Sequence, residues 1–186
     1  MNGYSIVLFL HIVGALGFFV ALGLEWTGLR QIGSAEVPVQ VRAWMGILSS
    51  TRKVGFASMF TTVITGIIMM LTVWGGAAWV IVSLGALVLV IALSLVLTGP
   101  RMVPIGRALM MEKGPLSQDF RRLANQQLLW ISIQTRIAIA LGIVLLKVAK
   151  PDLAGSLLII GIAIVLGIAS ALPVSGRERA QERAAH

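Results

Sequence analysis

The chain contains no cysteine, which excludes disulfide bridges, thiolate metal sites and iron–sulfur clusters. It has only 2 histidines, and one of them is the terminal residue His186. Its 7 acidic residues all lie outside the middle of the apolar stretches. A hydrolytic constellation, or a proton pump with carboxylates at mid-membrane depth, therefore lacks the residues that it needs.

Apolar residues, by contrast, are abundant: 58% of the chain is hydrophobic and only 12% is charged, about half the usual share of charge. This composition is typical of a membrane protein, and it leaves little chain for a separate soluble domain. We predict one integral membrane domain over residues 1–186. The net charge of +8 is spread over short segments between apolar runs, which argues against nucleic acid as a partner and favours a lipid bilayer.

Five apolar stretches are long enough to cross a bilayer, since a span needs about 20 residues at 1.5 Å per residue. These stretches are residues 4–24, 54–74, 79–97, 128–148 and 153–173. The fold class that we predict is an all-α bundle of five transmembrane helices. Small residues four apart, such as Gly17 with Ala21 and Ala138 with Gly142, indicate close helix contacts.

Basic residues indicate the orientation of this bundle, because Lys and Arg are retained on the cytoplasmic side of short loops. One side of the membrane would carry only Lys147 and Lys150. The other side would carry Arg30, Arg42, Arg52, Lys53, Arg101, Arg107, Lys113, Arg121, Arg122, Arg177, Arg179 and Arg183. We expect the N terminus outside and the C terminus in the cytoplasm, in a prokaryotic cytoplasmic membrane.

His11 is the first candidate functional residue, because an ionisable side chain within a span needs protein, water or a ligand to satisfy it. Gly14 and Ala15 follow at i+3 and i+4, so the surface beside the imidazole is small and can admit a flat macrocycle. Histidine is a common axial ligand of haem iron. The alternative is a neutral histidine hydrogen-bonded to Ser or Thr of a neighbouring span.

The second stretch offers a possible partner for His11. Its polar face contains Ser58, Thr62, Thr65, Met69 and Thr72 at helical spacing, and Met69 matches His11 in depth within a few Å. A His/Met pair can ligate haem iron or copper. Met69 is therefore a candidate second ligand. The alternative is that it only fills space between helices, as methionine in an apolar helix more often does.

Arg136 is the costliest residue to place in a membrane, about 12 Å into the fourth stretch. Lys147 lies on the same helix face, about 20° around. Glu25 and Asp152 fall at the predicted ends of spans, so we expect no carboxylate to pair with Arg136. Arg136 and Lys147 would then contact an anion such as the propionates of haem. Alternatively, Lys147 extends to the interface and Arg136 binds helix carbonyls or an acidic partner.

The order of these features resembles a known group of proteins. The segments are LFLHIVGALGFF in the first span, RKVGFASMFTTVITGIIMM in the second, WVIVSLGALVLVI in the third and LLKVAKPD at the end of the fourth. They resemble small integral membrane proteins of the CopD-like and HemJ-like group. The resemblance implies an α-helical bundle whose first-helix histidine, His11 here, is linked to haem in one branch and to copper uptake in the other.

Three functional hypotheses follow. The first is binding of haem b or a related porphyrin, with His11 as axial ligand, Met69 as a possible second ligand, and Arg136 and Lys147 on the propionates. The second is transport of copper or another small solute along His11, Met69 and Thr65. The third is a structural or assembly subunit. A homo-oligomer or larger membrane complex is a candidate partner, because a symmetric dimer could supply a second His11.

Overall fold

The computed structural model describes residues 2–112 and 114–184, with side chains as far as Leu172. The described chain is helical throughout and has no strand. Its elements are α1 (Gly3–Ser34), α2 (Pro38–Met69), the π-helical turn η1 (Met70–Trp74), α3 (Ala78–Leu93), the π-helical turn η2 (Ser94–Thr98), α4 (Gly99–Met111), α5 (Gln118–Ala124), α6 (Gln127–Ala149) and α7 (Leu153–Ala184).

Five helical segments of the described chain are long and apolar enough to cross a membrane, which confirms the helical class and the expectation of five long apolar helices. Their bounds are Gly3–Ser34, Pro38–Trp74, Ala78–Met111, Gln118–Ala149 and Leu153–Leu172. Four of these segments, all but the last, are much longer than the predicted stretches. In particular, α1 does not end near residue 24: it continues to Ser34, because Leu29 and Ile32 are buried in the core and hold this extension against the bundle.

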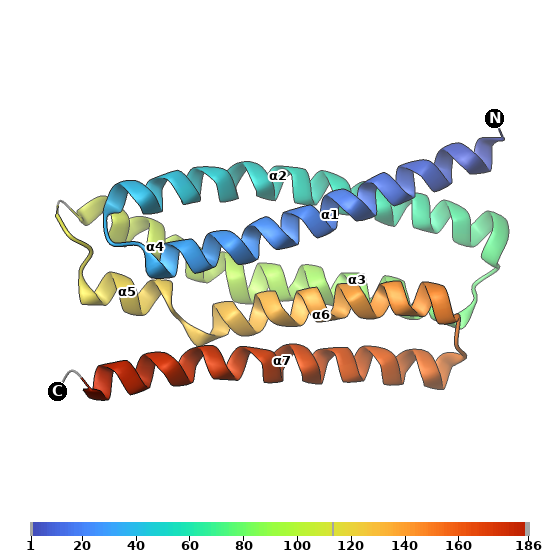
Figure 1. Ribbon diagram of the computed structural model, residues 1–186. Coiled ribbons are helices and arrows are strands. Elements are labelled where there is room, and N and C mark those ends of the chain that lie inside the picture. Colours follow the sequence, from blue (N-terminus) through green and yellow to red (C-terminus); the bar gives the residue numbers. More distant parts are fainter. Residues whose placement is uncertain (1, 113, 185–186) are drawn as a thin grey trace.

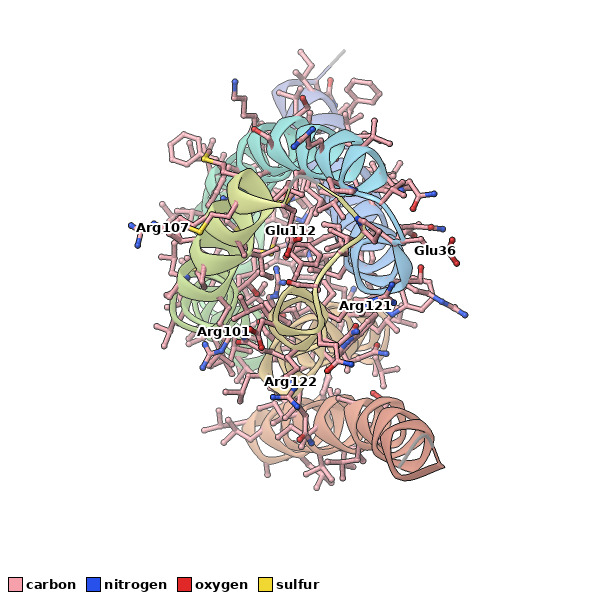
Figure 2. The ribbon with its side chains drawn as sticks, turned by 90° about the vertical axis from the view of Figure 1, so that its left-hand side faces the viewer. Glu36, Arg101, Arg107, Glu112, Arg121 and Arg122 are labelled. Atoms are coloured by element: carbon pink, nitrogen blue, oxygen red, sulfur yellow. The ribbon has the colours of Figure 1, made fainter. Side chains whose placement is uncertain are left out.

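The two chain ends lie at opposite ends of the bundle (Figure 1). We call them the N-terminal end, where α2 turns into α3 and α6 into α7, and the C-terminal end, where α1 turns into α2 and where α5 lies. Figure 2 looks onto the C-terminal end and shows Arg101, Arg107, Arg121 and Arg122 gathered there. The unequal distribution of basic residues therefore follows the two ends of the folded bundle.

Two helix pairs have the most extensive contacts, α1 with α2 and α6 with α7. Small residues make these contacts close, as the spacing predicted. A Cβ atom on Gly17 of α1 would lie 3.1 Å from Ser58 Cβ of α2, and one on Gly142 of α6 would lie 3.2 Å from Ala163 Cβ of α7. Each pair therefore behaves as one packed hairpin.

A short helix, α5, covers the C-terminal end beside α1 and α4. The Phe120 N–H donates to Ser117 Oγ at 3.2 Å, so Ser117 caps the N-terminus of α5. The chain then breaks at Asn125 instead of running on into α6, and Asn125 Nδ2 donates to the Gly33 carbonyl at 3.3 Å. This contact ties the connection to the end of α1.

Candidate functional site

Two cavities lie between the α1–α2 hairpin and α6, one closed on its remaining side by α3 and the other by η2 and α4. The larger, which we call the His11 cavity, has a volume of about 310 Å³ and is lined by His11, Met69, Trp74, Trp79 and Lys147 among others. The smaller, the Glu25 cavity, has a volume of about 220 Å³ and is lined by Glu25, Thr51, Arg52, Thr98 and Arg136 among others. Phe18 of α1 lines both cavities.

His11 is buried, and both nitrogens of its ring have protein partners. Nδ1 lies 3.0 Å from Thr65 Oγ1, and the Thr65 hydroxyl donates to the Thr61 carbonyl at 2.6 Å. Because the Thr65 proton is used there, its oxygen accepts from His11 Nδ1–H. This assigns the proton to Nδ1 and leaves the Nε2 lone pair as an acceptor facing Lys147. The hydrogen bond to Thr expected as the alternative for His11 is thus present.

Lys147 donates from Nζ to His11 Nε2. The ion pair that the described residues form joins Arg136 to Glu25, so no carboxylate of that part of the chain neutralises Lys147. The ammonium is half-buried at the wall of the His11 cavity. A protonated Lys147 whose partner is a neutral imidazole has no counter-charge among the described residues, so in that form it can attract an anion.

The remaining wall of the His11 cavity is apolar and aromatic. Trp74 and Trp79 lie at its N-terminal end with ring centroids 5.2 Å apart in an edge-to-face arrangement. Met69 and Ala15 also line the cavity, so Met69 and His11 share it. A Cβ on Gly66 would lie 3.3 Å from His11 Cε1, so the absence of a side chain there makes room for the imidazole. Gly14 instead lies against α2 and not in the cavity wall.

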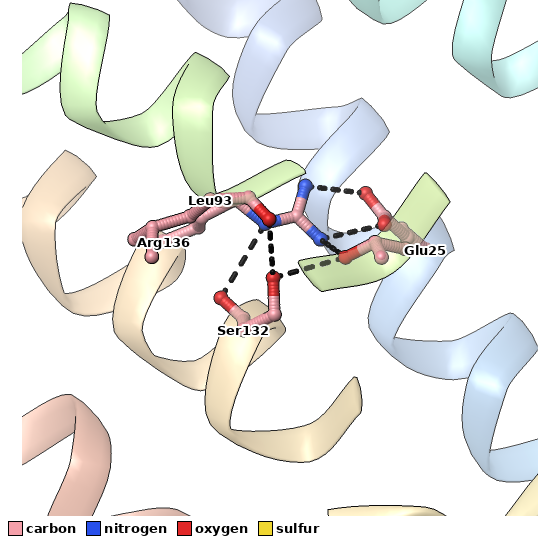
Figure 3. A network of polar contacts seen from close by, with 5 residues as sticks. Glu25, Leu93, Ser132 and Arg136 are labelled. Carbon is pink, nitrogen blue, oxygen red and sulfur yellow. Dashed lines mark hydrogen bonds and ion pairs between the residues drawn. The ribbon is translucent and has the colours of Figure 1, made fainter. Parts of the chain in front are cut away.

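Arg136 has a carboxylate partner, and the expectation that it lacks one is wrong. Its Nη1 and Nη2 atoms donate to the two carboxylate oxygens of Glu25 at 2.9 and 2.6 Å. Figure 3 shows this bidentate pair, which joins α6 to α1. The error came from the helix boundary: Glu25 is not at the end of a helix but within α1, which extends nine residues beyond it. The structure therefore gives Arg136 a protein anion in place of a propionate.

Hydroxyl groups complete the surroundings of Arg136. Nη2 also donates to Thr98 Oγ1 at 3.2 Å, and Thr98 Oγ1 lies 2.9 Å from Ser132 Oγ. Ser132 in turn donates to the Leu93 carbonyl at 3.2 Å (Figure 3). Leu93 directly precedes the π-helical turn η2. A π-helical turn interrupts the regular backbone hydrogen bonding of an α-helix, so a side chain of another helix can donate a hydrogen bond to a carbonyl beside it.

The contacts of Arg136 also revise its depth. Its partners Glu25 and Thr98 directly follow the apolar stretches 4–24 and 79–97. Arg136 thus lies near the level at which those stretches end, and not about 12 Å inside them as the start of the fourth stretch suggested. Arg52, another residue at such an end, lines the same cavity.

The structure brings together His11, Thr65, Met69, Ala15 and Lys147, and it separates Arg136 from them. Glu25, Thr98 and Phe18 were missed by the sequence interpretation. A signal for two of them exists: His11, Phe18 and Glu25 follow one another at seven-residue spacing, which places them on one face of a helix.

The described residues contain no group of three or more His, Asp or Glu side chains that could hold a metal ion. The copper hypothesis therefore depends on His11 and Met69 alone. No protein-family model matches this chain, and neither does any curated protein or solved structure.

Proposed function

We propose that this protein is an integral membrane protein with five spans, its N-terminal end outside and its C-terminal end in the cytoplasm. Five apolar helices support insertion, and the gathering of arginines at the C-terminal end supports this orientation. Tagging each end and testing its accessibility to protease in sealed vesicles checks both statements.

Within that bundle, we propose that the His11 cavity binds an amphipathic carboxylate, that is, a flat or apolar body with an acidic group. One observation carries this proposal: the Lys147 ammonium lies at the wall of an apolar cavity with an imidazole, not a carboxylate, as its partner. In surroundings of low dielectric constant, an ammonium without a counter-ion attracts an anion strongly.

The cavity walls indicate the rest of the ligand. Trp74, Trp79 and Phe19 offer aromatic surfaces to a planar apolar body. The volume of about 310 Å³ is at the small end of the range of about 300–1,000 Å³ for ligand pockets. A ligand of one or two rings with a single carboxylate fits this volume and the single uncompensated cation.

Haem b or another porphyrin is the second candidate, and the observation that favours it is that His11 and Met69 line one cavity. Thr65 holds the Nδ1–H of His11, which leaves Nε2 as the nitrogen available for iron. A macrocycle needs a wider cavity, so the α1–α2 hairpin would have to move away from α3 and α6. Lys147 would then contact a propionate. A bound haem would supply one-electron redox chemistry.

Tryptophan fluorescence of the purified protein tests the primary proposal, because Trp74 and Trp79 line the cavity. Benzoate, a one-ring carboxylate, is expected to quench this fluorescence saturably. Lys147→Met should weaken binding about tenfold or more, as expected for loss of one desolvated charge contact. Lys53→Met, which removes an exposed lysine outside the cavity, is the matched control.

An absorption spectrum separates the two candidates. Haem binding predicts a Soret band that His11→Ala shifts or removes, whereas benzoate binding without such a band supports the smaller carboxylate. If neither benzoate nor metal-free protoporphyrin binds in a way that depends on Lys147, the proposed ligand class is wrong.

A further inference from the structure

The two cavities belong to one line of contact between α1 and α6. Along α1, His11, Phe18 and Glu25 occur at intervals of seven residues, a distance of about 21 Å from first to last. Their partners on α6 come in the opposite sequence order: His11 contacts Lys147, and Glu25 contacts the earlier residue Arg136. We call this line the α1–α6 seam. It has a polar bridge at each end and an aromatic ring in the middle.

Phe18 is the part of the seam that separates the cavities. It lines both of them, and it packs against both hydrophobic clusters of the bundle, one at each level. Its side chain is only half-buried. Phe18 is thus a side chain that the two cavities share, and a change of its rotamer would alter the wall of both.

The charge of the seam suits an anion at both levels. Lys147 is the cation of the His11 cavity, while the Glu25 cavity contains Arg136 and Arg52 against the single carboxylate of Glu25. Each cavity therefore has one positive charge in excess. The Glu25 cavity also reaches the level at which the apolar stretches end, which gives it a route to water at the C-terminal end.

The Glu25 cavity is lined in part by a π-helical turn. Its wall includes Ser94 and Thr98 of η2. Such turns are rare in helices and occur frequently at functional sites. The Leu93 carbonyl at the start of this turn is held by Ser132 of α6, so a change in η2 is coupled to the helix that carries both basic residues of the seam.

We propose that the α1–α6 seam is a translocation path, through which the carboxylate bound in the His11 cavity passes Phe18 to reach the Glu25 cavity, down its own concentration gradient. This rests on the ligand class proposed above. The bound carboxylate takes Lys147 from His11 and weakens the bridge at that end. Phe18 is the gate that separates the bound carboxylate from the Glu25 cavity, which is open to the C-terminal end.

A pair of thiols tests the path, because the chain has no cysteine of its own. Ser83 and Ser94 lie in one continuous helical segment, Ser83 at the His11 cavity and Ser94 at the Glu25 cavity. Ser83→Cys and Ser94→Cys are small changes that introduce one thiol each. A membrane-impermeant thiol reagent, added to one side of oriented vesicles, should label Ser83→Cys from the N-terminal end and Ser94→Cys from the C-terminal end.

Removing the gate should join the two cavities. In a Phe18→Ala background, labelling of Ser94→Cys from the N-terminal end should become about tenfold faster, which corresponds to a barrier about 1.4 kcal/mol lower. Phe18→Leu serves the same purpose if the alanine variant does not fold. Unchanged labelling from the N-terminal end in a folded Phe18 variant overturns the role of Phe18.

Uptake of radiolabelled benzoate into proteoliposomes completes the test. Saturable uptake that is lost in Lys147→Met and slowed in Phe18→Trp supports the path. Benzoate that binds to the protein but is not taken up overturns the path and leaves the binding site standing. Absence of benzoate binding overturns the proposed ligand class itself, so the two failures are distinguishable.

Discussion

Arg136 and Lys147 lie about three turns apart on α6, and each contacts a residue of α1, but only Arg136 meets a carboxylate. The Arg136 guanidinium forms two hydrogen bonds with Glu25 and a third with Thr98, so its charge is balanced within the protein. Lys147 contacts a neutral imidazole. The difference indicates that one bridge holds helices together, whereas the other holds a charge available to a ligand.

The largest expected effect comes from breaking the balanced bridge. Glu25→Ala leaves the buried Arg136 guanidinium without its anion, which should lower the free energy of unfolding by about 3 kcal/mol. That figure is at the low end for a buried pair, because the Glu25 side chain is 23% exposed. Thermal unfolding in detergent measures it.

Glu36→Ala is the control for this prediction, since Glu36 is an exposed acid at the C-terminal end. Glu25→Gln keeps part of the hydrogen bonding and should fall between the two. If Glu25→Ala unfolds at the same temperature as Glu36→Ala, the bridge does not hold α1 to α6.

A smaller loss should follow from removing the hydroxyl that supports the same bridge. Thr98→Val deprives Arg136 Nη2 of an acceptor and Ser132 Oγ of a partner, at an expected cost of about 1 kcal/mol of unfolding free energy. Thr72→Val removes an exposed hydroxyl that bonds only to its own helix, and it should cost less. Equal costs for the two variants would contradict a supporting role for Thr98.

Lys147→Met should change the free energy of unfolding only slightly, in contrast to Glu25→Ala. Methionine removes a charge that no described carboxylate balances, and replacing an uncompensated charge at an apolar wall is neutral or stabilising, by up to about 1 kcal/mol. The same unfolding measurement serves. A loss as large as that of Glu25→Ala would show that Lys147 holds the fold in the way that Arg136 does.

The smallest effect is expected at Gly66, where a Cβ would lie 3.3 Å from His11 Cε1. Gly66→Ala should displace the imidazole slightly and change benzoate affinity, with a change in unfolding free energy below about 1 kcal/mol. Gly85→Ala is the control, because a Cβ at Gly85 meets nothing within 4 Å. Identical benzoate affinities in both variants would mean that the position of His11 does not matter to the site.

The sequence predicted the helical class and five long apolar helices because runs of apolar residues depend on local composition alone. The ends of α1 and α2 could not be predicted in this way. Both helices continue past their apolar stretches, held by buried side chains such as Leu29 and Val41 whose partners are distant in the sequence. This extension is what turned Glu25 from a supposed helix end into the partner of Arg136.

The sequence indicated individual residues of the candidate site, but not which of them contact each other. A lone ionisable residue in a span marks His11 and Lys147 individually, but their contact joins residues 136 positions apart and depends on the packing of α1 against α6. For His11 we predicted a hydrogen bond to a Ser or Thr of a neighbouring span, but not that this residue is Thr65. For Phe18, the seven-residue spacing places it on the same helix face as His11 and Glu25, but its position between two cavities exists only in the folded bundle.

One measurement tests the central claim that Lys147 presents an unbalanced charge to a ligand. Benzoate and benzamide have the same ring and differ in charge, so the ratio of their affinities, measured by tryptophan fluorescence, reports the contribution of a cation. We expect wild-type protein to prefer benzoate about tenfold or more, and Lys147→Met to bind the two equally. A preference for benzoate that survives unchanged in Lys147→Met would contradict the account.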